Sequence, residues 1–364
     1  MEGGGGFMGR MAALILVALC LAAPCLAEPA TPYTADTMLY YPQLTAPRQQ
    51  LFELIYHAAL RGLERIELPA GTRYEDALAA MEAVLADCPE LCALSHSAYS
   101  IGYTADQPEQ AVAIVPKYCM DASRQSELVH LARCLAAGAQ GDDFTREWYF
   151  HDLLCSTVTY DLTASAPHSA WGALMDGRAV CDGYARAMTL LCRLAGIRCG
   201  VVSGTSATAK GTNPHAWNIL CIDGVWTQLD ATFDDLDNGH FPSYFYFNLT
   251  DDQMRVNHTP GGSWTLPACT DMSANWHVRR CALAQTPEET EAQMMNGLRS
   301  LALGAASFSL RLARGEDYLA LFAELNGWEA RYNGACLPGE ELPGELLIYY
   351  CDEQQSVAIG LAEP

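Results

Sequence analysis

The chain has little positive charge. Its 364 residues include 21 Lys and Arg against 43 Asp and Glu, which gives a formal net charge of −22. An acidic surface repels phosphate groups, so nucleic acid and anionic membranes are disfavoured as partners. Basic or amine-bearing peptides would be attracted, although an acidic surface that keeps the protein dissolved is the simpler explanation of the charge.

The common metal and redox spacings are also missing. The sequence has no Cys-x-x-Cys pair and no His-x-x-x-His cluster. Structural zinc sites and dithiol redox sites depend on such spacings, so we expect no metal, no other cofactor and no thiol–disulfide exchange. Cys88 and Cys92 are the one closely spaced pair of cysteines after the N-terminal run, and this spacing is typical of two ordinary residues or of one disulfide.

Long hydrophobic runs are limited to the N-terminus. The uncharged run from Met11 to Ala23 is shorter than the roughly 20 residues that span a bilayer. Arg10 precedes it and Cys25-Leu26-Ala27 follows it, which is the layout of a secretory signal. We therefore expect residues 1–27 to be a signal peptide cleaved near Ala27, and the mature protein to be secreted or at the cell surface without a membrane-spanning segment. An uncleaved N-terminal anchor is the alternative.

The cysteines do not form a dense disulfide framework. With Cys20 and Cys25 in the expected signal, 13 of the 15 cysteines remain, an odd number that leaves at least one thiol without a partner in the chain. Half of the residues are hydrophobic, so a chain of this length can fold on its apolar core alone.

Periodicity and breakers divide the remainder into three regions. Residues 28–121 predict an α+β accessory region, 122–260 a middle domain, and 261–364 a small C-terminal α+β region that follows the breaker Pro260-Gly261-Gly262-Ser263. The expected helices cover residues 48–63, 74–86, 143–157, 287–303 and 317–326, with a further helix starting near 123; strands are expected at 98–103, 111–115 and 307–313 and near the C-terminus.

One helix carries a cysteine at its start. Gly177 breaks the preceding segment, Gly196 ends the helix, and the apolar stripe consists of Tyr184, Ala187, Met188, Leu191 and Ala195. Arg186 and Arg193 are expected away from this packed side. The free N–H groups and positive dipole end at Cys181 would stabilise a thiolate and donate to an oxyanion. A small buried cysteine is the alternative.

A hairpin brings a histidine and an aspartate together. Asp223-Gly224 is a strong two-residue turn, so Ile222 faces Val225 and Trp217 faces Asp230. His215 then projects from the same face and becomes a diagonal neighbour of Asp230. A slip of one residue would separate them, so the register predicts a carboxylate that orients an imidazole. A structural His–Asp pair is the alternative.

These residues predict cysteine-nucleophile chemistry. Cys181 would attack an acyl carbon, His215 would accept and return the proton, and Asp230 would hold the imidazole in the right tautomer. His258 is expected to cap or pack rather than to catalyse.

Residues 122–260 resemble the transglutaminase-like superfamily. The resemblance rests on His151-Asp152-Leu153, Tyr160-Asp161, Ala170 to Leu174, the strings around Cys181, His215 and Asp230, and Tyr244 to Asn248; Pro89-Glu90-Leu91 resembles an upstream region of secreted bacterial members. It implies a papain-like α+β core, with the nucleophile helix packed on an antiparallel sheet. It also implies that Cys181, His215 and Asp230 are nucleophile, base and orienter. The second oxyanion donor that the resemblance implies, or a substrate contact, would come from Trp171 or Trp217, and a place in the core is the alternative for Trp171.

The expected function is that of a secreted thiol enzyme acting on peptide amides through an acyl-enzyme. Water as acceptor makes it a peptidase or amidase, whose substrate is a peptide or protein such as a cell-wall peptide. An amine as acceptor makes it a crosslinking transglutaminase, and the triad serves both. A non-catalytic binding or structural module at the cell surface is the second class. The sequence does not indicate the oligomeric state.

Overall fold

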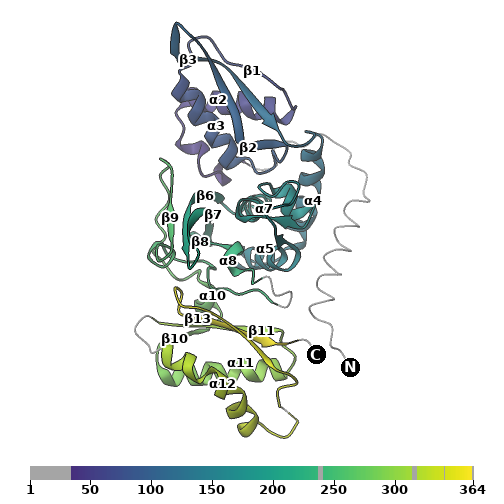
Figure 1. The fold of residues 1–364 in the computed structure, drawn as a ribbon, viewed down its shortest axis with the longest axis vertical. Helices are drawn as coiled ribbons and strands as arrows, with labels where there is room; N and C mark the ends of the chain where they lie inside the picture. The colour runs from purple at the N-terminus through teal and green to yellow at the C-terminus, as the bar shows by residue number, and fades with distance from the viewer. Residues whose placement is uncertain (1–33, 237–240, 314–317, 340, 363–364) are drawn as a thin grey trace.

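The computed structural model describes residues 34–236, 241–313, 318–339 and 341–362. The predicted signal peptide lies outside these residues. Three regions of mixed helix and strand follow one another along the long axis of the molecule (Figure 1). The expected α+β fold class is therefore confirmed, while the predicted boundaries at residues 121 and 260 stay predictions.

The N-terminal region packs two helices against a three-stranded antiparallel sheet of order β1-β3-β2. Its elements are η1 (Ala35–Thr37), η2 (Tyr41–Gln43), α2 (Ala46–Leu60), β1 (Ile66–Glu67), α3 (Tyr74–Asp87), β2 (Leu94–Thr104) and β3 (Gln107–Tyr118). Both expected helices and both expected strands are present, and the strands are longer than the apolar clusters that indicated them.

The middle region packs helix α7 on an antiparallel sheet of order β8-β7-β6-β9 (Figure 1). Its helices are α4 (Arg124–Gly138), α5 (Asp143–Thr157), α6 (Ala170–Leu174), α7 (Cys181–Leu194), α8 (Ala231–Asp234) and α9 (Asp251–Met254). Its strands are β4 (Thr159–Tyr160), β5 (Arg178–Ala179), β6 (Cys199–Thr208), β7 (Gly211–Ile222), β8 (Val225–Leu229) and β9 (His258–Pro260). The predicted arrangement of a cysteine-bearing helix on an antiparallel sheet is confirmed.

Arg186 and Arg193, which the sequence places off the apolar stripe of α7, are not solvent-exposed. Both are buried, and the end of α3 supplies partners for them. Arg193 Nη2 lies 2.6 Å from Asp87 Oδ1, and Arg186 Nη1 donates to the Leu85 carbonyl at 2.6 Å. Because this side of α7 is packed through arginines and their partners, it has no apolar stripe. The sequence of the helix therefore does not reveal that it also contacts α3.

The C-terminal region forms a sheet of order β10-β11-β13-β12 covered by two long helices (Figure 1). Its elements are α10 (Trp276–Arg279), β10 (Leu283–Ala284), α11 (Pro287–Ala302), β11 (Ser307–Leu312), α12 (Tyr318–Ala335), β12 (Leu346–Cys351) and β13 (Ser356–Leu361). Helix α12 continues to Ala335, beyond the expected end at Asn326, since Gly327 does not break it.

The apolar core runs through the region boundaries. One cluster joins Phe52 and Met81 of the N-terminal helices to Trp217 and Ile219 of β7. All 13 cysteines in the described part of the chain are free thiols, Cys88 and Cys92 among them. No helix in that part is long and apolar enough to cross a membrane.

Candidate active site

The hairpin has the predicted register. Asp223 and Gly224 have φ of 49° and 86°, the two positive values that a tight two-residue turn requires, and Ile222 pairs with Val225. At the other end of the hairpin, His215 Nε2 lies 2.6 Å from Asp230 Oδ2. The diagonal His–Asp pair expected from turn chemistry is confirmed.

Asp230 is buried and fully used as an acceptor. It caps the N-terminus of α8, where its Oδ1 accepts from the backbone N–H groups of Thr232 and Phe233 at 3.0 and 3.2 Å. Burial by itself would raise the pKa of this carboxyl. The charge and hydrogen bond of His215, followed by those of His258, outweigh burial and hold the pKa of Asp230 well below its usual range. Asp230 is therefore a carboxylate at every pH at which the fold is relevant.

His215 is held in its charged form. Burial lowers the pKa of this imidazole, but the charge and hydrogen bond of Asp230 raise it more, and Cys181 adds a further hydrogen bond, so that its pKa is about 10. His215 therefore has the orienting carboxylate on one side and the Cys181 side chain as a further hydrogen-bond partner. At neutral pH the imidazole is an imidazolium paired with a carboxylate.

Cys181 is the first residue of α7 and is only partly buried. The N–H groups of Gly183 and Tyr184 donate back to the Val180 carbonyl, while those of Cys181 and Asp182 precede the first intrahelical bond. The thiol therefore lies at the positive end of the helix, beside N–H groups that can receive an oxyanion. The predicted placement of Cys181 at a helix N-terminus is confirmed.

His258 is a site residue that the sequence did not indicate. Strand β9 pairs with β6, and this brings His258 Nε2 to 3.0 Å from Asp230 Oδ2, the oxygen that His215 also contacts. The other nitrogen, Nδ1, lies 2.6 Å from Asn257 Oδ1. The expectation that His258 packs rather than catalyses fits its burial, but its partner is the orienting carboxylate itself. A three-residue strand after an irregular connection offers no pattern that would have shown this.

Tyr160 also lies near the thiol. The parallel pairing of β4 with β5 places Tyr160 opposite Ala179, two residues before Cys181. Partial burial raises the pKa of this phenol, and the charges of Cys181 and Asp230 raise it further. In the sequence, Tyr160 stood out only as part of the resemblance. Its partly exposed hydroxyl is a candidate substrate contact.

The two tryptophans named as candidate oxyanion donors are engaged elsewhere. The Trp171 indole N–H donates to Asp176 Oδ1 at 3.1 Å, and the Trp217 indole N–H donates to Gln228 Oε1 at 2.8 Å. Trp171 lies in the apolar core, and Trp217 stacks beside His215 with ring centroids 6.2 Å apart. Trp217 therefore supports the imidazole by packing, and the oxyanion role of either residue stays a prediction.

His215, Asp230 and His258 are residue types that also bind metals, and their nearest ligand atoms lie within 4.8 Å of one another. Ligands about 2.0 Å from a tetrahedral ion lie about 3.3 Å from each other. The N–O distances here are 2.6 and 3.0 Å, which are hydrogen-bond distances. The cluster therefore fits shared protons better than a bound ion.

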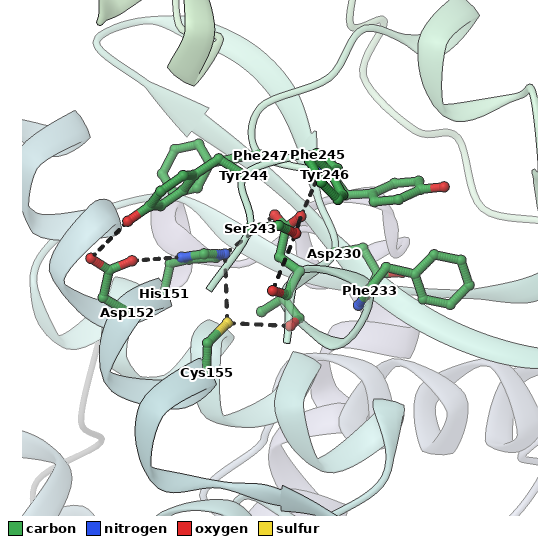
Figure 2. A network of polar contacts seen from close by, with 12 residues as sticks. His151, Asp152, Cys155, Asp230, Phe233, Ser243, Tyr244, Phe245, Tyr246 and Phe247 are labelled. Carbon is green, nitrogen blue, oxygen red and sulfur yellow. Dashed lines mark hydrogen bonds and ion pairs between the residues drawn. The ribbon is translucent and has the colours of Figure 1, made fainter. Parts of the chain in front are cut away.

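A second group of cysteine, histidine and aspartate lies behind the site. His151 lies between Asp152, 2.9 Å from Nδ1, and the Cys155 sulfur, 3.6 Å from Nε2 (Figure 2), and Asp234 Oδ2 is 3.2 Å from Nε2. Burial lowers the pKa of His151, but these neighbours together raise it well above the usual range. Burial raises the pKa of the Cys155 thiol to about 12.

This second group is closed to substrate, since His151 and Asp234 have no exposed side-chain surface. It fastens α5 to α8, the short helix that Asp230 caps. Asp234 also accepts from the Ser243 hydroxyl at 3.0 Å and from the Tyr246 N–H at 2.9 Å. We assign it a supporting role: it positions the end of α8 opposite the orienting carboxylate.

Part of the chain is similar to known proteins. Residues 130–231 match the family model of the transglutaminase-like superfamily. Kyphoscoliosis peptidase from Homo sapiens and from Mus musculus is similar over 93 residues, at 30% and 29% identity. The match covers 22% of this chain and only 14% of each relative.

Two solved structures are also similar in part. A proposed cysteine protease from Cytophaga hutchinsonii is 22% identical, with a TM-score of 0.26 over 29% of this chain and 37% of its own. A TGase is 16% identical, with a TM-score of 0.23 over 46% of this chain and 48% of its own.

Proposed function

We propose that this chain, whose residues 130–231 form a transglutaminase-like domain, is a secreted thiol enzyme that acts on peptide amide bonds through an acyl-enzyme on Cys181. The observation that carries the proposal is the alignment of a partly exposed thiol at a helix N-terminus with a buried imidazole and carboxylate. The N-terminal apolar run supports the secreted location. A peptide or protein, such as a cell-wall peptide, is the proposed substrate.

The charges support an ion-pair mechanism. Because the pKa of His215 is raised to about 10, the imidazolium is present at neutral pH and stabilises a thiolate beside it. The thiolate of Cys181 attacks the carbonyl carbon, and the helix N–H groups receive the oxyanion. The C–N bond then breaks as His215 gives its proton to the leaving amine, which leaves a thioester on Cys181.

The acceptor completes the reaction. Water or an amine loses a proton to His215 as it attacks the thioester, and the thiolate–imidazolium pair is restored. Water is the acceptor we favour, because the similar relatives carry the name peptidase. Crosslinking to an amine uses the same residues and remains the second form of the proposal.

The test is selective alkylation. The chain from Glu28 onward is treated with chloroacetamide at about pH 6, where ordinary thiols are protonated, and the modified cysteines are mapped. We expect rapid labelling of Cys181 in the unchanged protein and loss of that labelling in His215→Ala. In the matched control Cys155→Ala, Cys181 should still be labelled rapidly.

Turnover is then measured with peptide amides, in water and with an added primary amine. Cys181→Ala should abolish product formation while the melting temperature is retained. Uniform slow labelling of all thiols, or turnover by Cys181→Ala, would contradict the mechanism and leave the non-catalytic binding module as the better interpretation.

A further inference from the structure

A cavity of about 480 Å³ lies between the N-terminal region and the catalytic sheet. The N-terminal region supplies Tyr40, Glu82, His96 and Tyr99 to its walls. The catalytic region supplies Arg186 of α7, residues 201–204 of β6, and the segment that follows β9, including Trp264. The accessory region therefore forms one side of a cavity whose other side is the catalytic core.

The cavity adjoins the nucleophile. Val201 lines it and also belongs to the small apolar cluster that packs against Cys181. Gly204, another lining residue, pairs directly with His215 across the β6–β7 ladder. Arg186 lies one helical turn after Asp182, the residue that follows Cys181. Two lining residues thus also belong to the surroundings of the triad, Val201 through the cluster on which Cys181 packs and Gly204 through its pairing with His215.

Of the charged residues among the described lining residues, Arg186 is buried and Glu82 lies at the exposed edge. Arg186 Nε lies 3.1 Å from Asp182 Oδ1, so the guanidinium is neutralised within its own helix. Burial, and then the positive charges of Arg186 and His168, lower the pKa of His96 well below its ordinary value, so this imidazole is neutral at pH 7. Glu82 is exposed. A charged ligand group in the interior would lack a counter-ion and lose its hydration.

Two lining residues, His96 and Arg186, have a buried side-chain nitrogen without a hydrogen bond among the described residues, and of these Arg186 Nε still lies in an ion pair with Asp182. His96 Nε2 is buried and has no hydrogen bond among the described residues. A buried polar atom without a partner is costly, so it favours a ligand that brings a hydrogen-bonding group. Around it the walls are mainly aromatic and aliphatic, with the Tyr40 and Trp264 ring centroids 5.1 Å apart.

We propose that this cavity is a side-chain subsite for the peptide substrate, and that it takes an uncharged aromatic side chain with a hydrogen-bonding tip, of the tyrosine type. The aromatic walls bind the ring, and His96 Nε2 binds the hydroxyl. The inference rests on the proposed function, because it makes the accessory region the part of the protein that selects the peptide to be cleaved.

The test measures binding apart from turnover. The full chain carrying Cys181→Ala is titrated with fluorescently labelled peptides of alanine and glycine, in which one variable residue is moved through each position. We expect at least one position where tyrosine binds tenfold or more tighter than alanine, lysine or glutamate. Phenylalanine should bind roughly 2- to 12-fold more weakly than tyrosine, the range of one hydrogen bond.

Second variants locate the effect. Ala86 lines the cavity, so Ala86→Phe should fill it and remove the preference, while Ala79→Phe, on the same helix but outside the cavity, should keep it. His96→Leu should equalise tyrosine and phenylalanine without weakening phenylalanine.

Three outcomes would overturn the inference: no preference for tyrosine, a preference for a charged residue, or a preference that survives Ala86→Phe. Selective labelling of Cys181 without a tyrosine preference refutes the subsite alone. A tyrosine preference without activated Cys181 refutes the proposed function and leaves a peptide-binding cavity.

Discussion

Replacing Asp230 by asparagine tests the electrostatics of the site most directly. Asp230 accepts from four N–H groups: His215 Nε2 at 2.6 Å, His258 Nε2 at 3.0 Å, and the backbone of Thr232 and Phe233. Asparagine has the same shape as aspartate but only one acceptor oxygen. Its NH₂ group takes the place of the other carboxylate oxygen and therefore faces N–H donors that it cannot accept from. The change therefore removes the charge and leaves donors unpaired without creating a cavity.

The magnitude follows from the pKa of His215. A rise from 6.5 to about 10 corresponds to roughly 4–5 kcal/mol of favourable interaction with the imidazolium, at about 1.4 kcal/mol per pKa unit. Because the pKa is raised in the folded state, this stabilisation is complete below pH 6.5 and is lost as the pH rises through 10. Without the carboxylate, burial is no longer opposed, and the pKa of His215 falls to its ordinary value or lower.

The consequence is a loss of thiolate at neutral pH. A thiol without an imidazolium neighbour ionises near pH 8.5, so only about one in thirty is reactive at pH 7. In Asp230→Asn we expect Cys181 to react more slowly with chloroacetamide at pH 7 than in the unchanged protein, by up to the roughly 30-fold that separates a full thiolate from an ordinary thiol. The rate of substrate turnover at neutral pH should fall in parallel.

The assay follows Cys181 labelling from about pH 5 to pH 10, with the melting temperature measured on the same samples. Asp152→Asn is the matched control, because Asp152 contacts a different buried histidine, His151. Only Asp230→Asn should change the pH profile of labelling. An unchanged profile in that variant would refute the view that Asp230 holds His215 charged.

Two further predictions concern residues that support the site. His258→Leu removes one of the two imidazole donors to Asp230, and we expect kcat to fall about tenfold with little change in KM. His258→Gln keeps a donor and should recover most of the lost kcat. An equal loss of kcat in both variants would indicate that His258 acts by packing alone. Arg193→Met leaves the Asp87 carboxylate buried without its charged partner and should lower the free energy of unfolding, measured in urea, by about 3–5 kcal/mol. The matched change at the exposed Arg65, Arg65→Met, should lower it by less than about 1 kcal/mol. Similar losses in the two variants would contradict the importance of the buried ion pair.

Sequence reasoning was accurate where chain neighbours decide the geometry. The turn at Asp223-Gly224 determines which residues of β7 and β8 face each other, so the contact between His215 and Asp230 followed from counting outward. Likewise, a glycine break followed by an apolar stripe is sufficient to start a helix at Cys181.

The failures occurred where distant segments meet. The helical pattern placed Arg186 and Arg193 off the apolar stripe of α7, but it could not show that they are buried or that α3 supplies a carbonyl and a carboxylate for them. His151 and Asp234 form a buried pair whose members come from separate helices, and each looks like an ordinary polar residue in its own helix.

The sequence by itself determined the nucleophile's place at a helix start, the pairing of imidazole with carboxylate, and the α+β class, because turns, caps and periodicity act over a few residues. The tertiary structure alone decided that His258 shares the orienting carboxylate and that His96 lines a cavity beside the thiol. Those contacts depend on how β9 and the accessory region dock on the sheet. Docking is set by packing and charge pairing between segments far apart in the chain, which leave no local pattern.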